Sequence, residues 1–246
     1  MLNPRCNALL DGLTESEGMA VFQSMRLVSL ADGQQLYAPG DLIDQVYFPV
    51  TALIAIAKEM KDGLSIDVAW VGKEGGVGFR GMVSRCPNRV YVTSSGLAYQ
   101  ISLKQLQQIQ DYHLSRRSPQ QTLDSGAWLT RMYVQATSAI FDSMALQTAC
   151  AHFHSNRDRV ARWLLARQEH GQSPCIEATH QKIAYSLGIR RESVTHALLQ
   201  LKGIEYSRNQ IEVHDFVQLE SQACECHRAQ SESASDQLRL RFDAHF

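Results

Sequence analysis

Two short helical patterns separated by a single glycine constrain this chain more than any other feature of its sequence. They lie in THQKIAYSLGIRRESVTHALLQL, residues 179–201, with Gly188 between them. Thr179 can cap the start of the first helix, and glycine accepts the positive φ of a sharp turn at little cost. Apolar residues recur at helical spacing on both sides of the turn: Ile183, Ala184 and Leu187 before it, and Val194, Ala197, Leu198 and Leu201 after it. This spacing predicts a helix-turn-helix pair with two buried faces.

Two arginines at the start of the second helix point to a contact outside the chain. Arg190 and Arg191 stand at the positive end of the helix dipole, where an exposed cation costs about 0.3–1 kcal/mol. A recognition helix has a reason to accept this cost, because its N-terminal residues meet bases and phosphates in the major groove of DNA. Arginine can pair with guanine, and Glu192 can accept a hydrogen bond from cytosine. Thr195 and His196 share the exposed face. The alternative is a structural helix pair whose polar face is solvated.

The charge distribution favours a polyanionic partner. The chain has a formal net charge of −1, but residues 155–214 carry nine basic and six acidic side chains. The first helix begins with Thr179, His180 and Gln181, where free backbone N–H groups favour a phosphate.

Composition excludes several classes of protein. Hydrophobic residues make up 44% and charged residues 20% of the 246 residues, which is ordinary for a soluble globular protein. The N-terminus lacks the apolar run of a secretory signal, and no stretch approaches the roughly 18 apolar residues needed to span a bilayer. The six cysteines are mostly isolated, so we expect a reducing cytoplasm rather than a disulfide framework.

Residues 27–103 favour β structure. Short β-branched and aromatic runs such as QVYFPVTALIAIA alternate with turn signals, and nine of the fifteen glycines fall here. We predict a jelly-roll type of β roll. An enzyme built on a cupin-like roll would need several His or carboxylate ligands from the strands. The absence of histidine from residues 27–103 argues against it.

A long helix is predicted after Pro119, over residues 121–153. At about 45 Å, a helix of some 30 residues is too long to bury against a small β domain alone. We predict that it pairs with its copy in a homodimer. The proposed stripe follows a period of about 3.5 residues and comprises Leu129, Tyr133, Ala136, Ile140, Ser143 and Gln147. The alternative is a helix that packs along the side of the β roll.

Further elements follow this helix. SNRDRVARWLLARQEHG predicts a second helix, with an inner stripe at Val160, Trp163, Leu164 and Arg167. QSPCIEA is expected to be a short linker. GIEYSRNQIEVHD alternates as a small β-hairpin, and the last 30 residues predict a short helix and then a polar tail.

These motifs resemble the Crp/Fnr superfamily of bacterial transcription regulators over about residues 20–227. IRRESVTHALLQLKG is similar to the family's recognition helix, and IEYSRNQIEV to its wing. LYAPGDLIDQVYFPVTALIAI is similar to its opening β-roll strands, RVARWLLARQ to the helix after its dimer helix, and LESQACEC to the ending of one subgroup.

The resemblance implies residue roles at the DNA. Arg191, Glu192 and His196 fall where the cyclic-AMP receptor protein of this family makes its main base contacts, with histidine here in place of an arginine. Thr179, Gln181 and Ser193 match phosphate-contacting positions. Arg208 in the wing is added for its charge. The predicted DNA-binding set is therefore Thr179, His180, Gln181, Arg190, Arg191, Glu192, Ser193, Thr195, His196 and Arg208.

The family's cyclic-nucleotide motif is broken in this sequence. The Gly-Glu pair that would hold the ribose is interrupted by Lys73, and Arg89 is followed by valine and tyrosine instead of a small hydroxyl residue and alanine. We therefore expect an effector other than cyclic AMP, or none. If a ligand binds the β roll, Gly72, Glu74, Gly75 and Arg89 are the candidate pocket residues.

No cofactor or metal site is predicted. Cys224, Cys226 and His227 look like part of a metal site, but one thiol pair and one histidine do not complete a tetrahedral set. Near the N-terminus only Cys6 is available, which argues against an iron–sulfur sensor. No histidine spacing indicates haem.

The predicted protein has an α+β fold of four parts: a cyclic-nucleotide-binding-like β roll (1–120), a dimerisation helix (121–153), a winged helix-turn-helix domain (154–227) and a polar tail (228–246). Its predicted function is that of a homodimeric transcription regulator, not an enzyme. Its predicted partners are a near-palindromic DNA site, a second copy and, as the resemblance implies, RNA polymerase, with no membrane. The alternative is a ligand-binding β-roll module whose helical domain contacts proteins and not DNA.

Overall fold

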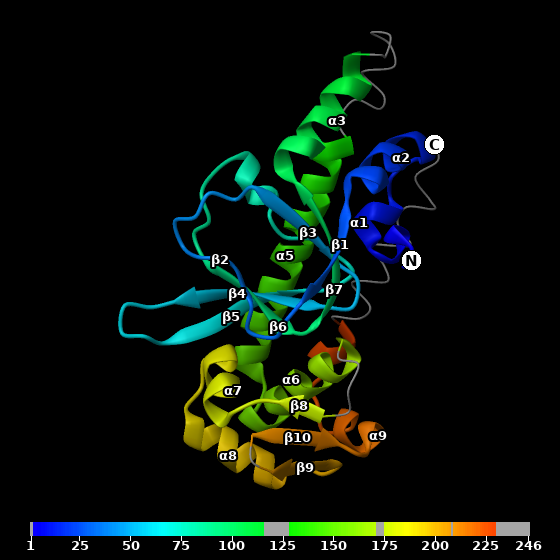
Figure 1. Ribbon diagram of the computed structural model, residues 1–246. Helices are drawn as coiled ribbons and strands as arrows, with labels where there is room; N and C mark the ends of the chain where they lie inside the picture. Colours follow the sequence, from blue (N-terminus) through cyan, green and yellow to red (C-terminus); the bar gives the residue numbers. More distant parts are fainter. Residues whose placement is uncertain (1, 116–127, 171–174, 208, 230–246) are drawn as a thin grey trace.

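The computed structural model describes residues 2–115, 128–170, 175–207 and 209–229. A β roll, a long helix and a domain of short helices with a small sheet follow one another along the chain (Figure 1). Among the helices in these ranges, none has the length and hydropathy needed to cross a membrane.

The β roll consists of two antiparallel sheets, as predicted. One has the order β1-β7-β3 and the other β2-β6-β4-β5. The strands are β1 (Arg26–Leu30), β2 (Gln35–Tyr37), β3 (Gln45–Pro49), β4 (Leu53–Glu59), β5 (Ser65–Val71), β6 (Arg89–Ser94) and β7 (Gly96–Ser102). Apolar residues from both sheets form a shared core that includes Leu30, Ile54, Val71, Val92 and Ala98. These β-branched and aliphatic side chains fit the pleated, half-buried surface of a strand.

Short helices cover one end of the roll. They are η1 (Pro4–Cys6), α1 (Ala8–Asp11), α2 (Glu15–Ser24), η2 (Phe79–Met82) and α3 (Leu103–Ser115). Thr14 and Glu17 form a capping box that fixes the start of α2. These helices pack with the first half of the long helix around a second core that includes Leu10, Phe48 and Met132.

The long helix α5 (Trp128–Phe153) runs from the roll down to the C-terminal domain (Figure 1). The predicted dimer stripe faces its own chain and not outward. Leu129, Ala136 and Ser143 are buried, and the Ser143 hydroxyl bonds to both the N–H and the carbonyl of Trp70, at 3.0 and 3.1 Å. Tyr133 and Ile140 pack against the two β-roll cores. This face of α5 therefore packs along the side of the β roll, which was the alternative to pairing with a second copy. Residues 121–127 of the predicted helix lie outside the described residues.

A second stripe of α5 faces outward. It comprises Val134, Ser138, Phe141, Ala145, Thr148 and His152, all of which are exposed. Val134 and Phe141 are 57% and 69% exposed despite their apolar side chains. This stripe has the same alternating four- and three-residue spacing as the predicted one, displaced by two residues. Two residues correspond to about 200° around the helix axis, so the stripes lie on opposite faces.

The C-terminal domain contains the helix-turn-helix and the wing. Its elements are α6 (Asn156–His170), β8 (Cys175–Glu177), α7 (His180–Leu187), α8 (Arg191–Gln200), β9 (Ile204–Ser207), β10 (Gln210–Val213) and α9 (Phe216–Glu220). The predicted hairpin is present as β9 and β10. The expected linker is wrong in part, because Cys175–Glu177 adds β8 to the free edge of β10. Three residues are too few to show an alternation in the sequence.

Candidate nucleic-acid interface and its buried link to the β roll

The helix-turn-helix has the geometry that the sequence predicts. The Thr179 side chain accepts a hydrogen bond from the Lys182 N–H at 3.0 Å and caps α7. Gly188 takes a φ of +62°, and its N–H bonds to the Ala184 carbonyl, so the chain turns sharply into α8. Ile183, Leu187, Val194 and the other predicted apolar residues are buried between the two helices, α6 and the wing.

The start of α8 is exposed and basic. Arg190 and Arg191 are exposed, and Arg190 occupies the N-cap without a side-chain hydrogen bond to the helix. Within the described part of the chain, neither guanidinium forms an ion pair. Glu192, next to Arg191, is exposed, and so is His196 one turn further along α8. Thr179 and Gln181 at the start of α7 are exposed as well. Ser193 is half-buried. A polyanion could therefore approach these groups without displacing an internal partner.

Two predicted DNA contacts have partners inside the domain. His180 Nδ1 lies 2.7 Å from the Thr195 hydroxyl, and the His180 ring packs against Tyr206 of β9 with a centroid separation of 4.6 Å. Burial lowers the pKa of His180, and the nearby charge of Arg191 lowers it further, so both favour the neutral ring. These contacts join α7, α8 and the wing. Arg208 lies outside the described residues, beside Asn209 with its positive φ of 70°.

A buried carboxylate links this domain to the β roll. Asp67 of β5 is 3% exposed and accepts hydrogen bonds from Trp70 Nε1 at 3.0 Å and from the Tyr91 hydroxyl at 2.8 Å. The hydroxyl of Ser186, on α7, donates to the same carboxylate. The Arg167 guanidinium of α6 lies 3.9 Å away. One side chain of the roll therefore accepts a hydrogen bond from α7 and forms an ion pair with α6.

Arg167 completes this network. Its guanidinium lies over the Trp163 ring, 3.4 Å from the centroid, and donates to the Trp163 carbonyl at 3.2 Å and to the Thr93 hydroxyl of β6. Burial lowers its pKa to about 10 even though Asp67 is close, so it remains charged at neutral pH. Burial likewise raises the pKa of Asp67. Desolvation thus opposes both charges, and the hydrogen bonds hold them in place.

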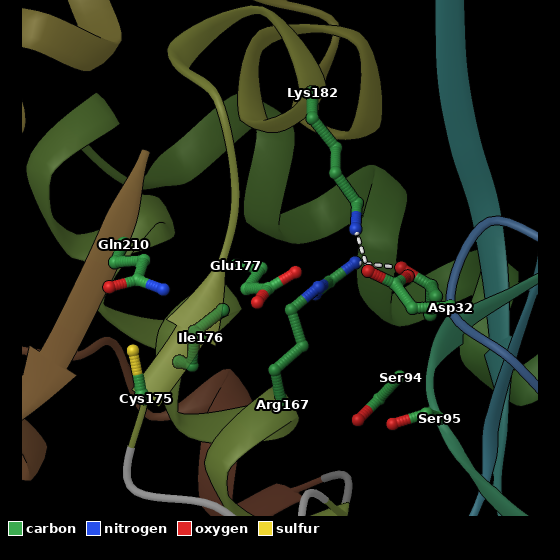
Figure 2. Close-up of a pocket in the computed structure, with 10 residues that line it drawn as sticks. Asp32, Ser94, Ser95, Arg167, Cys175, Ile176, Glu177, Lys182 and Gln210 are labelled. Atoms are coloured by element: carbon green, nitrogen blue, oxygen red, sulfur yellow. Dashed lines mark hydrogen bonds and ion pairs between the residues drawn. The ribbon is translucent and has the colours of Figure 1, made fainter. Parts of the chain in front are cut away.

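A cleft of about 530 Å³ opens beside this network, between the roll and the C-terminal domain. Figure 2 shows that Asp32, Ser94 and Ser95 of the roll face Glu177, Lys182 and Gln210 of the domain. Arg167 also lines the cleft. The Lys182 ammonium reaches across to the Asp32 carboxylate, which gives a second, partly exposed link between the two parts.

The candidate ligand residues of the roll do not form one site. Arg89 pairs with Glu59 at 2.9 Å and stacks on Tyr91, 4.3 Å from its centroid. The Gly72 N–H donates to the Glu74 carboxylate at 2.7 Å, and burial raises the pKa of that group. Arg89, on β6, lies opposite Ala57 of β4. Val71, the residue before Gly72, lies opposite Ile54 of β4, about 10 Å further along that strand. Because β5 and β6 pair with opposite edges of β4, Arg89 and Gly72 are separated along the strand and across it. Gly75 is buried, and its carbonyl accepts from the Asn7 side chain at 2.8 Å.

Asp67 and Ser186 are not among the residues predicted from the sequence, because they belong to no recognisable motif or spacing. Arg167 carried a signal, because an arginine occupied an apolar position of the predicted α6 stripe. Such a residue must bury its charge with a partner, and the sequence does not show where the partner lies.

Comparisons with known proteins agree with this geometry. Residues 158–222 match the Crp-like helix-turn-helix domain family. The sequence has no significant match among the curated proteins.

Several solved structures share the fold. A Crp/Fnr-family transcriptional regulator from Eubacterium rectale is 15% identical with a TM-score of 0.62, over 89% of this chain and 98% of its own. FixK2 from Bradyrhizobium japonicum is 15% identical with a TM-score of 0.57, over 81% and 98%. A CRP-family transcriptional regulator from Thermus thermophilus is 16% identical with a TM-score of 0.55, over 80% and 96%. Residues 158–222 are therefore a Crp-like helix-turn-helix domain, and the chain shares its overall fold with these solved structures of Crp/Fnr-family regulators.

Proposed function

We propose that the protein is a homodimeric, sequence-specific DNA-binding regulator in which α8 is the recognition helix. The observation that carries this proposal is the exposed start of α8, where Arg190 and Arg191 have no ion-pair partner among the described residues and Glu192 and His196 lie on the same face. The N-terminal turn of a recognition helix meets base edges in the major groove, and arginine and glutamate can tell base pairs apart there.

The outward stripe of α5 supports the homodimer. Val134, Ser138, Phe141, Ala145, Thr148 and His152 recur at the spacing of a coiled-coil seam. Two apolar side chains that are more than half exposed on one helix face lose contact with water when the face pairs with its copy. The small side chains between them allow close approach. A symmetric dimer would place two recognition helices about 34 Å apart on a near-palindromic site.

The β roll supports an effector other than cyclic AMP. One structural neighbour, CLP from Xanthomonas campestris, is a regulator responsive to c-di-GMP, and another, from Silicibacter pomeroyi, is described as cAMP-binding. In this chain Arg89 is held by Glu59 and Tyr91, away from Glu74. A cyclic phosphate would have to compete with both contacts. Asp67 of the roll contacts Ser186 of α7 and Arg167 of α6, so a change in the roll could reach the helix-turn-helix through these contacts.

Selection of bound fragments from sheared genomic DNA tests the proposal. The purified protein is used without added ligand at roughly 150 mM salt, where screening weakens non-specific binding. We expect enrichment of one inverted repeat and its loss in Arg191→Ala. Arg26→Ala removes the same charge from an exposed position on β1 and should leave the enrichment unchanged.

Two results would contradict the DNA proposal. Equal enrichment by wild type and Arg191→Ala would show that α8 does not read the DNA. Failure to enrich any sequence, with and without cyclic nucleotides, would favour a helical domain that contacts proteins.

Sedimentation tests the dimer separately. Phe141→Glu places a charge on the outward stripe and should convert dimer to monomer. Leu42→Glu makes the same kind of change at a 71% exposed position on the roll and should leave the dimer intact. A Phe141→Glu variant that remains dimeric would place the dimer contact elsewhere.

A further inference from the structure

Four potential metal ligands meet where the long helix joins the C-terminal domain. Cys150 and His154 are four residues apart on the last turn of α5 and just after it, and Cys224 and Cys226 follow α9. Their ligand atoms all lie within 4.8 Å of one another. The three cysteines are buried and His154 is half-buried, so little of the cluster is open to water.

The spacing within the cluster fits one tetrahedral metal ion. Zn–S bonds of about 2.3 Å at tetrahedral angles place neighbouring sulfurs about 3.8 Å apart, and an imidazole nitrogen slightly closer. The sulfurs of Cys150 and Cys224 are 3.6 Å apart, and Cys226 Sγ lies 3.5 Å from His154 Nδ1. A set of three cysteines and one histidine with no open position is typical of a structural zinc site.

The surroundings of His154 set its free nitrogen toward the cluster. His154 Nε2 lies 3.1 Å from the Glu225 carboxylate. A carboxylate that accepts from one ring nitrogen leaves the other, Nδ1, as the ligand, and metal-bound histidines commonly have such a partner. Glu225 lies between Cys224 and Cys226, so the same turn supplies two thiols and this carboxylate.

Positive charge lies beside the thiols. Arg159 and Arg162 of α6 line a small cavity together with Cys150 and Gln147. Three thiolates and a neutral imidazole around a divalent ion carry one net negative charge, which a neighbouring guanidinium offsets.

We propose that Cys150, His154, Cys224 and Cys226 bind a zinc ion that fixes the C-terminal segment to the junction between α5 and α6. The junction is short, since α5 ends at Phe153 and α6 begins at Asn156. A metal there ties the direction of α6, and with it the helix-turn-helix, to the long helix. A neighbouring contact, His227 Nε2 with Glu169 at 3.2 Å, holds the same segment to α6.

The proposed site differs from what the sequence leads us to expect. In the sequence, Cys224, Cys226 and His227 lack a fourth ligand, and no metal site is predicted there. In the folded chain His227 pairs with Glu169, and His154 and Cys150, more than 70 residues earlier, complete the set.

Metal content tests the proposal directly. The full-length protein is produced without a histidine tag in zinc-supplemented medium, and zinc per chain is measured by elemental analysis. We expect one zinc ion per chain in the wild type and its loss in Cys226→Ser and His154→Ala. His154→Cys should retain zinc through four thiolates. Cys6→Ser, at an exposed cysteine outside the cluster, should also retain it.

Cobalt titration of the metal-free wild type gives a readout that does not depend on how variants fold. We expect the intense visible absorption of a tetrahedral cobalt–thiolate centre, saturating at one equivalent and displaced by zinc. Glu225→Gln should weaken zinc binding roughly 10–100-fold, because it removes the carboxylate that orients His154.

Three outcomes would overturn the proposal. The first is a wild-type chain that carries no zinc and gives no cobalt spectrum. The second is equal zinc in Cys226→Ser. The third is a mass two hydrogens lower under non-reducing conditions together with a peptide map that joins Cys150 to Cys224, which would assign these thiols to a disulfide. None of these measurements uses DNA, so they test the zinc site independently of the proposed DNA-binding function.

Discussion

Removing the Asp67 carboxylate tests the buried link between the β roll and the helix-turn-helix. Asp67→Ala leaves three donors, on Trp70, Tyr91 and Ser186, without their acceptor. It also leaves the Arg167 guanidinium buried without its counter-charge. Loss of one member of a buried ion pair destabilises a protein by about 3–5 kcal/mol. The three unsatisfied donors also destabilise the folded state, so we expect a change within this range.

The expected loss of unfolding free energy is therefore about 4 kcal/mol. For a chain of this length, 1 kcal/mol corresponds to roughly 2–4 °C in melting temperature, so Asp67→Ala should melt about 10 °C lower. Thermal and urea unfolding followed by circular dichroism measure both quantities. Asp111→Ala, at an exposed position on α3, should change stability by less than about 0.5 kcal/mol.

A double-mutant cycle isolates the pair. Burial raises the pKa of Asp67 and lowers that of Arg167 to about 10, so desolvation disfavours the charged form of each group. Asp67→Ala combined with Arg167→Met removes both charges. It should cost clearly less than the sum of the single changes, with a coupling of about 2 kcal/mol. Additivity within about 0.5 kcal/mol, or an Asp67→Ala chain as stable as the wild type, would refute this reasoning.

Three further changes follow from the structure. Gly188→Ala should lower the melting temperature more than Gly33→Ala. Both glycines have positive φ, but a Cβ at Gly188 would lie 2.8 Å from Ile66, whereas a Cβ at Gly33 would have no neighbour within 4 Å. Equal losses would contradict this reasoning. The free energy of unfolding should fall by roughly 1–3 kcal/mol as pH drops from about 6.5 to 4, because burial lowers the pKa of folded His170 to about 4 and the unfolded chain therefore takes up the proton first. In urea titrations, His170→Gln should remove this part of the pH dependence, and an unchanged profile would exclude His170 as its source. Thr195→Val should lower the melting temperature by the equivalent of about 1 kcal/mol, because it removes the hydrogen bond to His180; a larger loss of DNA affinity than of stability would instead give Thr195 a direct contact.

Local features of the sequence determined the helix-turn-helix. Gly188, the Thr179 cap and the apolar spacing each act within a few residues, so α7, the turn and α8 could be predicted nearly to the residue. The strands of the roll followed from their β-branched runs for the same reason. The exposed arginines of α8 were readable as well, because a cation at a helix N-terminus opposes the helix dipole whatever surrounds it.

Only the tertiary structure decided which face of α5 turns outward. The stripes that contain Ala136 and Phe141 have the same 3.5-residue spacing, so periodicity could not choose between them. The choice was made by the roll, whose surface accepts the small side chains of Ala136 and Ser143 and leaves Phe141 exposed.

The buried polar and metal-ligating groups depend on tertiary structure in the same way. Asp67 meets Ser186 across 119 residues, and Cys150 meets Cys224 across 74. A lone aspartate or cysteine gives no signal in the sequence until folding brings its partners together. Secondary structure arises from neighbours along the chain, whereas these sites arise from neighbours in space.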